Sequence, residues 1–193
     1  PPEQFALLLD NVQLVNPRKM SVEDIQMLFK LAKYCGLRIS EAIRLKAEDI
    51  DIELKEVYLG KTKTREHDKA VIPDHFAEEL SSYVGGKTGR LFMTNRRTVD
   101  YWLRKLGKAL NIIALTTPQS ETHEKTKCHI FRKSIGKDIV FGEYGKGGHI
   151  GIAQALLRHD KATTTADYLR LSIDGVKEFW EGRKATQKGD NEQ

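Results

Sequence analysis

The sequence is poor in the features that mark membrane, disulfide-rich and metal-binding proteins. Its 193 residues contain no hydrophobic run of membrane-spanning length, so no membrane contact is expected. Two cysteines, Cys35 and Cys128, are too few for a disulfide framework, and we expect reduced, buried thiols in a cytosolic protein. No second Cys/His pair at ligand spacing accompanies Cys128 and His129, so no metal is predicted. The glycine-rich segment 142–148 lacks the pattern of a nucleotide-binding phosphate loop, and no cofactor is predicted.

The charge balance is mildly basic, with 32 Lys and Arg residues against 27 Asp and Glu residues and a net charge of +5. The positive residues are grouped more than the total suggests. One group holds Lys61, Lys63 and Arg65, and a second holds Arg96, Arg97, Arg104, Lys105 and Lys108. Such groups are either solvated faces or surfaces that follow a phosphate backbone, and the sequence leaves both open.

Hydrophobic periodicity predicts an α+β fold that is mainly helical, with a small antiparallel sheet. Ser21 is expected to cap a helix that Gly36 ends, and Ser40 to start another, which places Arg38 at a helix–helix junction. Two short strands, 56–59 and 70–72, predict a β-hairpin with a basic tip. Further helices are expected over 73–84, 97–110, 129–141 and 150–157, from Thr163, and along the apolar stripe Ile173, Val176, Phe179 and Trp180.

Arg38, His129 and Arg132 are suited to holding a phosphate. Attack on a phosphodiester builds negative charge on the non-bridging oxygens, and the planar guanidinium of arginine can contact two of them at once. His129 and Arg132 are three residues apart, which on a helix places both side chains on one face. Each residue taken alone also fits an ordinary structural role, so the prediction depends on their combination.

Tyr168 is the candidate nucleophile, and it stands nine residues after His159. A free phenol has a pKa of about 10 and needs a base or nearby cations to react at neutral pH. Either His159 or His129 is a candidate for that base. A departing sugar 5′-oxygen also needs a proton, and a lysine can supply it. Lys61, directly after the first predicted strand, is the first candidate for this general acid, and Lys63 is its rival.

These residues and their surroundings together resemble the catalytic domain of the tyrosine recombinases, the phage-integrase and Xer-like family. The similarity covers roughly residues 20–182 and depends on segments in a fixed order: Gly36 to Glu41 with Leu45 and Asp49-Ile50, Gly60-Lys61, His129 to Arg132, and His159 to Tyr168. Two positions depart from the family pattern. Arg158 stands where the family usually has glycine, and Lys133 stands where it often has histidine.

The resemblance implies a site-specific recombinase that cleaves and rejoins double-stranded DNA through a 3′-phosphotyrosine, without metal or ATP. The implied catalytic residues are Arg38, Lys61, His129, Arg132, His159 and Tyr168. It further implies a homotetramer on DNA and a nucleoid-associated cytoplasmic location. Two alternatives remain at this point: a type IB topoisomerase-like enzyme, and a DNA-binding assembly module without catalysis.

The resemblance also suggests a domain organisation. We interpret residues 1–20 as a linker or N-terminal arm, residues 21–184 as the catalytic domain and residues 185–193 as a disordered tail. Residues 1–20 are too short for the family's N-terminal DNA-clamp domain, so we expect an isolated catalytic domain. The apolar stripe of residues 173–180 is expected to pack either on its own domain or on a neighbouring subunit.

Overall fold

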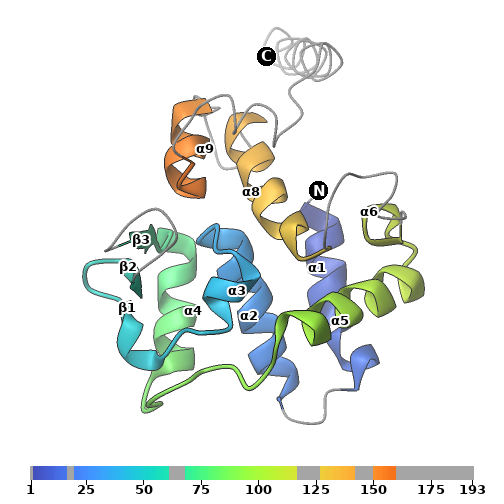
Figure 1. Cartoon of the computed structure of the whole chain (residues 1–193), viewed down its shortest axis with the longest axis horizontal. Coiled ribbons are helices and arrows are strands. Elements are labelled where there is room, and N and C mark those ends of the chain that lie inside the picture. The colour runs from blue at the N-terminus through green and yellow to red at the C-terminus, as the bar shows by residue number, and fades with distance from the viewer. Residues whose placement is uncertain (1, 17–19, 61–67, 117–126, 142–149, 160–193) are drawn as a thin grey trace, which may run out of the picture. The chain divides into compact units, whose positions relative to one another are not determined.

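The computed structural model describes residues 2–16, 20–60, 68–116, 127–141 and 150–159 (Figure 1). The chain divides into two compact units, residues 1–135 and 136–193, and the division falls inside helix α8 (Ile130–Phe141). The first unit contains most of the described elements. Within it, helices α2 (Val22–Tyr34) and α3 (Ile39–Ala42) stand between the sheet on one side and helices α1 (Pro2–Asp10) and α5 (Arg96–Ala109) on the other (Figure 1).

The segment interpreted as a linker or N-terminal arm contains two helices among its described residues. Residues Pro2–Asp10 form helix α1 and Val12–Val15 form the 3-10 helix η1. Proline is well tolerated in the first turn of a helix, where its missing N–H has no intrahelical partner. The apolar side chains recur at helical spacing and are buried in the core: Phe5, Leu8, Leu9, Val12 and Val15. The boundary drawn at residue 21 stays a prediction.

Helix α2 begins and ends as the sequence predicts. The Ser21 hydroxyl accepts the Asp24 N–H at 3.0 Å, and the Asp24 carboxylate accepts the Ser21 N–H at 3.0 Å, which makes a reciprocal capping box. The helix stops before Gly36, whose φ of 58° lies in the left-handed region that glycine tolerates. The next helix starts earlier than expected, because Arg38 and not Ser40 is the N-cap of α3.

The predicted hairpin is present and belongs to a three-stranded antiparallel sheet in the order β1-β2-β3. Strand β2 (Glu56–Gly60) pairs with β3 (Asp68–Val71), with Tyr58 opposite Lys69, and with the short strand β1 (Ile50–Asp51), which follows the 3-10 helix η2 (Ala47–Asp49). The predicted basic tip, residues 61–67, lies outside the described residues. The mainly helical fold with a small antiparallel sheet is therefore confirmed.

Helices α4 (Asp74–Val84) and α5 (Arg96–Ala109) match the predicted spans closely. Helix α5 buries the stripe Val99, Trp102, Leu103 and Leu106, while its other face is polar. Short helix α6 (Ile113–Thr116) returns onto it where Gly107 leaves room: a Cβ at Gly107 would lie 2.4 Å from the Cβ of Leu115. Gly107 therefore permits the close packing of α6 on α5.

The 3-10 helix η3 (Lys127–His129) leads into α8, so His129 precedes the α-helix on which the sequence placed it. In the second unit, helix α9 (Ile150–Leu157) has the predicted bounds and buries Ala153 and Leu157. Arg158 follows it with φ of 52°, in the left-handed region that glycine adopts more readily than arginine. Among the described helices, none is long and apolar enough to cross a membrane.

Candidate active site

Arg38 lies at the predicted junction between α2 and α3, and Glu41 holds it in place. The Arg38 Nη1 donates to Glu41 Oε1 at 2.6 Å, and the Arg38 backbone N–H donates to Glu41 Oε2 at 2.6 Å. The Glu41 side chain is only 5% exposed, whereas that of Arg38 is 42% exposed. A buried carboxylate thus orients a guanidinium whose outer part remains accessible to a ligand.

Arg132, in the first turn of α8, is almost completely buried, with 2% of its surface exposed. Its Nη1 donates a hydrogen bond to the carbonyl oxygen of Gly36, in the turn that precedes Arg38. Burying a guanidinium has a large desolvation cost, so this position is an unusual one for an arginine. The contact joins the start of α8 to the α2–α3 turn and brings the two predicted arginines to one place.

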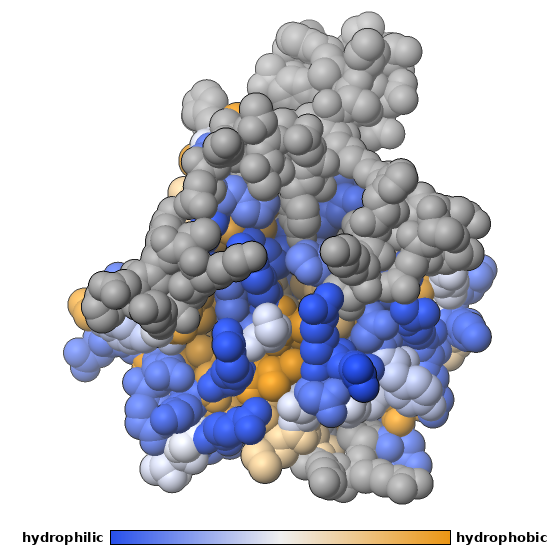
Figure 2. All heavy atoms as spheres, viewed as in Figure 1, coloured by the Kyte–Doolittle hydropathy of each residue, from blue (hydrophilic) through white to orange (hydrophobic). Residues whose placement is uncertain are grey.

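Arg38, His129 and Arg132 line one hollow in the first unit, with a volume of about 230 Å³. His129 contributes from the turn η3 and Arg132 from α8, so their convergence does not require the shared helical face that the sequence suggested. The remaining lining residues are Ile39, Ser40, Arg96 and Cys128. The face in Figure 2 is mostly hydrophilic, with a small hydrophobic area between hydrophilic groups.

Arg96 was not among the predicted site residues, although the sequence placed it in a basic group. It is the first residue of α5, which follows the N-cap Asn95, and it is exposed. The grouping of Arg96 with other basic residues of the same segment was the sequence signal that could have indicated a role in binding an anion. Only the tertiary structure separates Arg96, which lines the hollow, from its neighbour Arg97, which does not.

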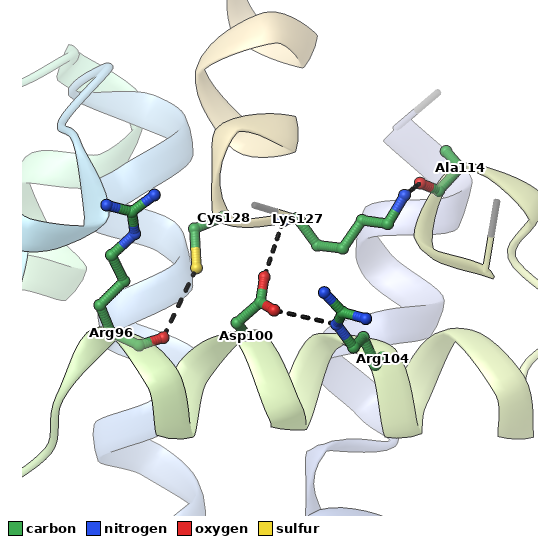
Figure 3. A network of polar contacts seen from close by, with 6 residues as sticks. All are labelled: Arg96, Asp100, Arg104, Ala114, Lys127 and Cys128. Carbon is green, nitrogen blue, oxygen red and sulfur yellow. Dashed lines mark hydrogen bonds and ion pairs between the residues drawn. The ribbon is translucent and has the colours of Figure 1, made fainter. Parts of the chain in front are cut away.

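A network of polar contacts fixes η3 against α5 (Figure 3). Asp100 Oδ1 accepts the Lys127 backbone N–H at 2.7 Å, and Asp100 Oδ2 accepts from Arg104 Nε at 2.9 Å. The Cys128 thiol lies 3.9 Å from the carbonyl oxygen of Arg96. One carboxylate of α5 thereby anchors the backbone two residues before His129.

Lys33 of α2 was not singled out by the sequence and is buried, with 1% of its surface exposed. Its Nζ donates to the Ser134 hydroxyl at 2.8 Å and lies 5.1 Å from the centre of the Phe5 ring. The ammonium of this α2 residue thus contacts side chains of both α8 and α1. Its contacts are consistent with a supporting role, because a buried charge is tolerated only with such partners.

The described residues that line the hollow include none of the other predicted site residues. Lys61, its rival Lys63, and Tyr168 lie outside the described residues. His159 is described in the second unit, where its backbone N–H donates to the Gln154 carbonyl oxygen at 3.0 Å. Among the described residues, no group of three His, Cys, Asp or Glu side chains is placed to hold a metal ion.

The mainly helical fold with a small antiparallel sheet is that expected of a tyrosine recombinase catalytic domain. The family model described as the phage integrase family matches residues 2–173, which is most of the chain, and the chain belongs to that family. A tyrosine recombinase of Thermosipho africanus is 27% identical over 160 residues, or 77% of this chain and 52% of that protein. The chain spans about half the length of the curated relatives it matches.

Solved structures share the fold. The catalytic domain of bacteriophage HP1 integrase aligns with a TM-score of 0.64 at 18% identity, covering 94% of this chain and 92% of that one. The integrase of transposon Tn1549, solved in complex with transposon right end DNA, aligns with a TM-score of 0.62 at 15% identity, covering 96% of this chain and 65% of that one. At these identities, the likeness concerns the fold alone.

Proposed function

We propose that the chain is the catalytic part of a site-specific DNA recombinase and that its substrate is double-stranded DNA. The observation that carries the proposal is the hollow in which Arg38, His129 and Arg132 meet. Membership of the phage integrase family supports the same reaction. The recombinase and integrase names of the similar proteins favour it over a type IB topoisomerase or a non-catalytic module.

In this proposal the hollow receives the scissile phosphate. The accessible part of the Arg38 guanidinium and the His129 ring contact the non-bridging oxygens. Arg132, which also lines the hollow, adds positive charge. Because Glu41 and the Gly36 carbonyl orient the two arginines before DNA arrives, little reorganisation is needed as negative charge develops.

Tyr168 then attacks the phosphorus. The bond between the phenolic oxygen and phosphorus forms as the bond from phosphorus to the 5′-oxygen breaks, which leaves a 3′-phosphotyrosine and a free 5′-hydroxyl. His159 or His129 takes the phenolic proton, and Lys61 donates a proton to the departing 5′-oxygen, with Lys63 as the alternative donor. Attack by a 5′-hydroxyl of a partner strand reverses these steps, so the covalent link conserves the bond energy and ATP is not required.

The covalent step is tested with the full chain and a nicked duplex. After cleavage of this duplex, the short fragment that carries the new 5′-hydroxyl diffuses away. We expect a protein–DNA adduct that survives denaturation. Tyr168→Phe removes only the hydroxyl and serves as the control that retains DNA binding. An adduct formed by Tyr168→Phe would show that another residue is the nucleophile, and no adduct with the unaltered chain would count against recombinase activity.

Recombination joins two duplexes, so the proposal includes a homotetramer on DNA at the nucleoid. The apolar stripe of residues 173–180 is the candidate contact between subunits, although it lies outside the described residues. Truncation before Ser172 is expected to abolish higher-order DNA complexes while a folded monomer remains. Unchanged assembly after truncation would eliminate this role for the stripe.

A further inference from the structure

Arg96 lines the same hollow as Arg38 and Arg132, which makes three guanidinium groups around about 230 Å³. The three residues come from different elements: Arg96 from the first turn of α5, Arg38 from the cap of α3, and Arg132 from α8. The side chain of Arg96 leaves α5 on the side where Cys128 lies, away from the pairing of Asp100 with Arg104 (Figure 3).

The charge around the hollow is uneven. Among the described residues that line it, none carries a carboxylate, and the nearby carboxylate of Glu41 is already engaged by Arg38. Like charges brought together in a partly buried space repel one another, and the repulsion is relieved when an anion enters. Three guanidinium groups therefore favour an occupant with several negatively charged oxygens over an empty hollow.

The position of Arg96 relative to His129 is set by backbone contacts. Asp100, one helical turn after Arg96, accepts the Lys127 N–H at 2.7 Å, and the Cys128 thiol lies 3.9 Å from the Arg96 carbonyl oxygen. Helix α5 and the η3 turn consequently hold Arg96 and His129 beside each other. Arg97, the next residue of α5, is also exposed but does not line the hollow.

We propose that Arg96 is a third phosphate-contacting arginine, which binds a non-bridging oxygen of the scissile phosphate together with Arg38 and Arg132. The inference deepens the proposed function and names a residue beyond the predicted catalytic set. Arg96 adds charge from α5, so the phosphate is contacted from a third direction.

The first test measures binding of inorganic phosphate to the full chain without DNA, at constant ionic strength in chloride. We expect phosphate to raise the Tm of the unaltered chain, and Arg96→Ala to bind it roughly ten- to a hundredfold more weakly. Arg97→Ala, an equal loss of charge at the neighbouring position, is the matched control and is expected to bind normally. Equal phosphate binding by Arg96→Ala and the unaltered chain would overturn the inference.

The second test uses a duplex with a neutral methylphosphonate at the scissile position, which removes the negative charge that an arginine neutralises. We expect Arg96→Ala to slow cleavage of the ordinary duplex and to approach the unaltered chain on the methylphosphonate. A defect of the same size on both substrates would assign Arg96 a structural role. Phosphate binding that depends on Arg96, without any covalent adduct from the unaltered chain, would reject the recombinase proposal and retain the anion site.

Discussion

The guanidinium of Arg132 donates a hydrogen bond to the carbonyl oxygen of Gly36, a residue 96 positions earlier in the chain. Gly36 lies between the C-terminal end of α2 and the N-cap Arg38. This contact holds Arg132 of α8 against the turn that precedes Arg38. It also gives the guanidinium, which has only 2% of its surface exposed, a hydrogen-bond acceptor inside the protein.

Arg132→Ala and Arg38→Ala are each expected to lower both the stability of the chain and its rate of cleavage. Removing Arg132 leaves the Gly36 carbonyl without this donor and should lower the free energy of unfolding by about 1–3 kcal/mol. Removing Arg38 leaves the Glu41 carboxylate, which is only 5% exposed, without its cation, so Arg38→Ala should also lower the free energy of unfolding. Both variants should cleave about 100-fold or more slowly, because each loses a cation directed at the transition state.

Urea unfolding and single-turnover cleavage of the same preparations separate these effects. Near-normal cleavage by Arg38→Ala would show that Arg38 serves only as the ion-pair partner of Glu41 and has no part in catalysis. Unchanged stability of Arg132→Ala would contradict the structural role assigned to the Arg132 contact with Gly36.

The general acid can be assigned by replacing the 5′-bridging oxygen with sulfur, which leaves without a proton. If Lys61 is the donor, Lys61→Ala should cleave the ordinary duplex slowly and the sulfur-containing duplex at the rate of the unaltered chain. Lys63→Ala is the matched control, two residues away in the same basic group, and should show no selective rescue. The reverse pattern would assign the role to Lys63.

Gly107→Ala should destabilise the first unit, because the added Cβ would meet the Leu115 side chain at 2.4 Å. Forcing an extra methyl group into this packing is expected to lower the free energy of unfolding by about 1–3 kcal/mol. Gly151→Ala in α9 is the control, since its Cβ would meet no atom within 4 Å, and it should be neutral or slightly stabilising. Denaturant titration of both variants measures the difference, and equal effects would argue against the close approach of α5 and α6.

The lowered pKa of the Asp24 carboxyl predicts that its contribution to the free energy of unfolding depends on pH. Partial burial acts to raise the pKa of Asp24, but hydrogen bonds from the Tyr83 hydroxyl at 2.7 Å and from Ser21, with the charge of Lys87, outweigh it and lower the pKa. Since the folded-state pKa is below the unfolded-state pKa of about 4, the stabilising contribution of Asp24 is complete above the unfolded-state pKa. It is lost as the pH falls through the folded-state pKa.

Comparing the unaltered chain with Asp24→Asn from pH 7 down to pH 2 tests this. The stability difference between them should be largest at neutral pH and shrink on acidification. Tyr83→Phe removes one of the hydrogen bonds that lower the pKa of Asp24, so its acid-induced loss of stability should be smaller and should be complete at a higher pH. A stability difference that does not vary with pH would show that the Asp24 charge is not linked to folding.

Local patterns in the sequence were sufficient for the secondary structure and for the family. The stripe on α5, the Ser21 capping box and the hairpin of β2 and β3 each involve residues close in sequence, so their spacing reports them directly. Residues 1–20 are weakly patterned and contain three prolines, which led to their interpretation as a linker or N-terminal arm, and the structure forms a helix with a buried face over Pro2–Asp10.

The amino-acid sequence by itself determined the family, the mainly helical fold and the identities of Arg38, His129 and Arg132 as candidates. Only the tertiary structure decided that these three residues meet, that Glu41 and the Gly36 carbonyl orient the arginines, and that Arg96 joins them while Arg97 does not. The physical reason is that periodicity reveals which face of an element is buried. Which other element that face contacts depends on packing between segments distant in sequence.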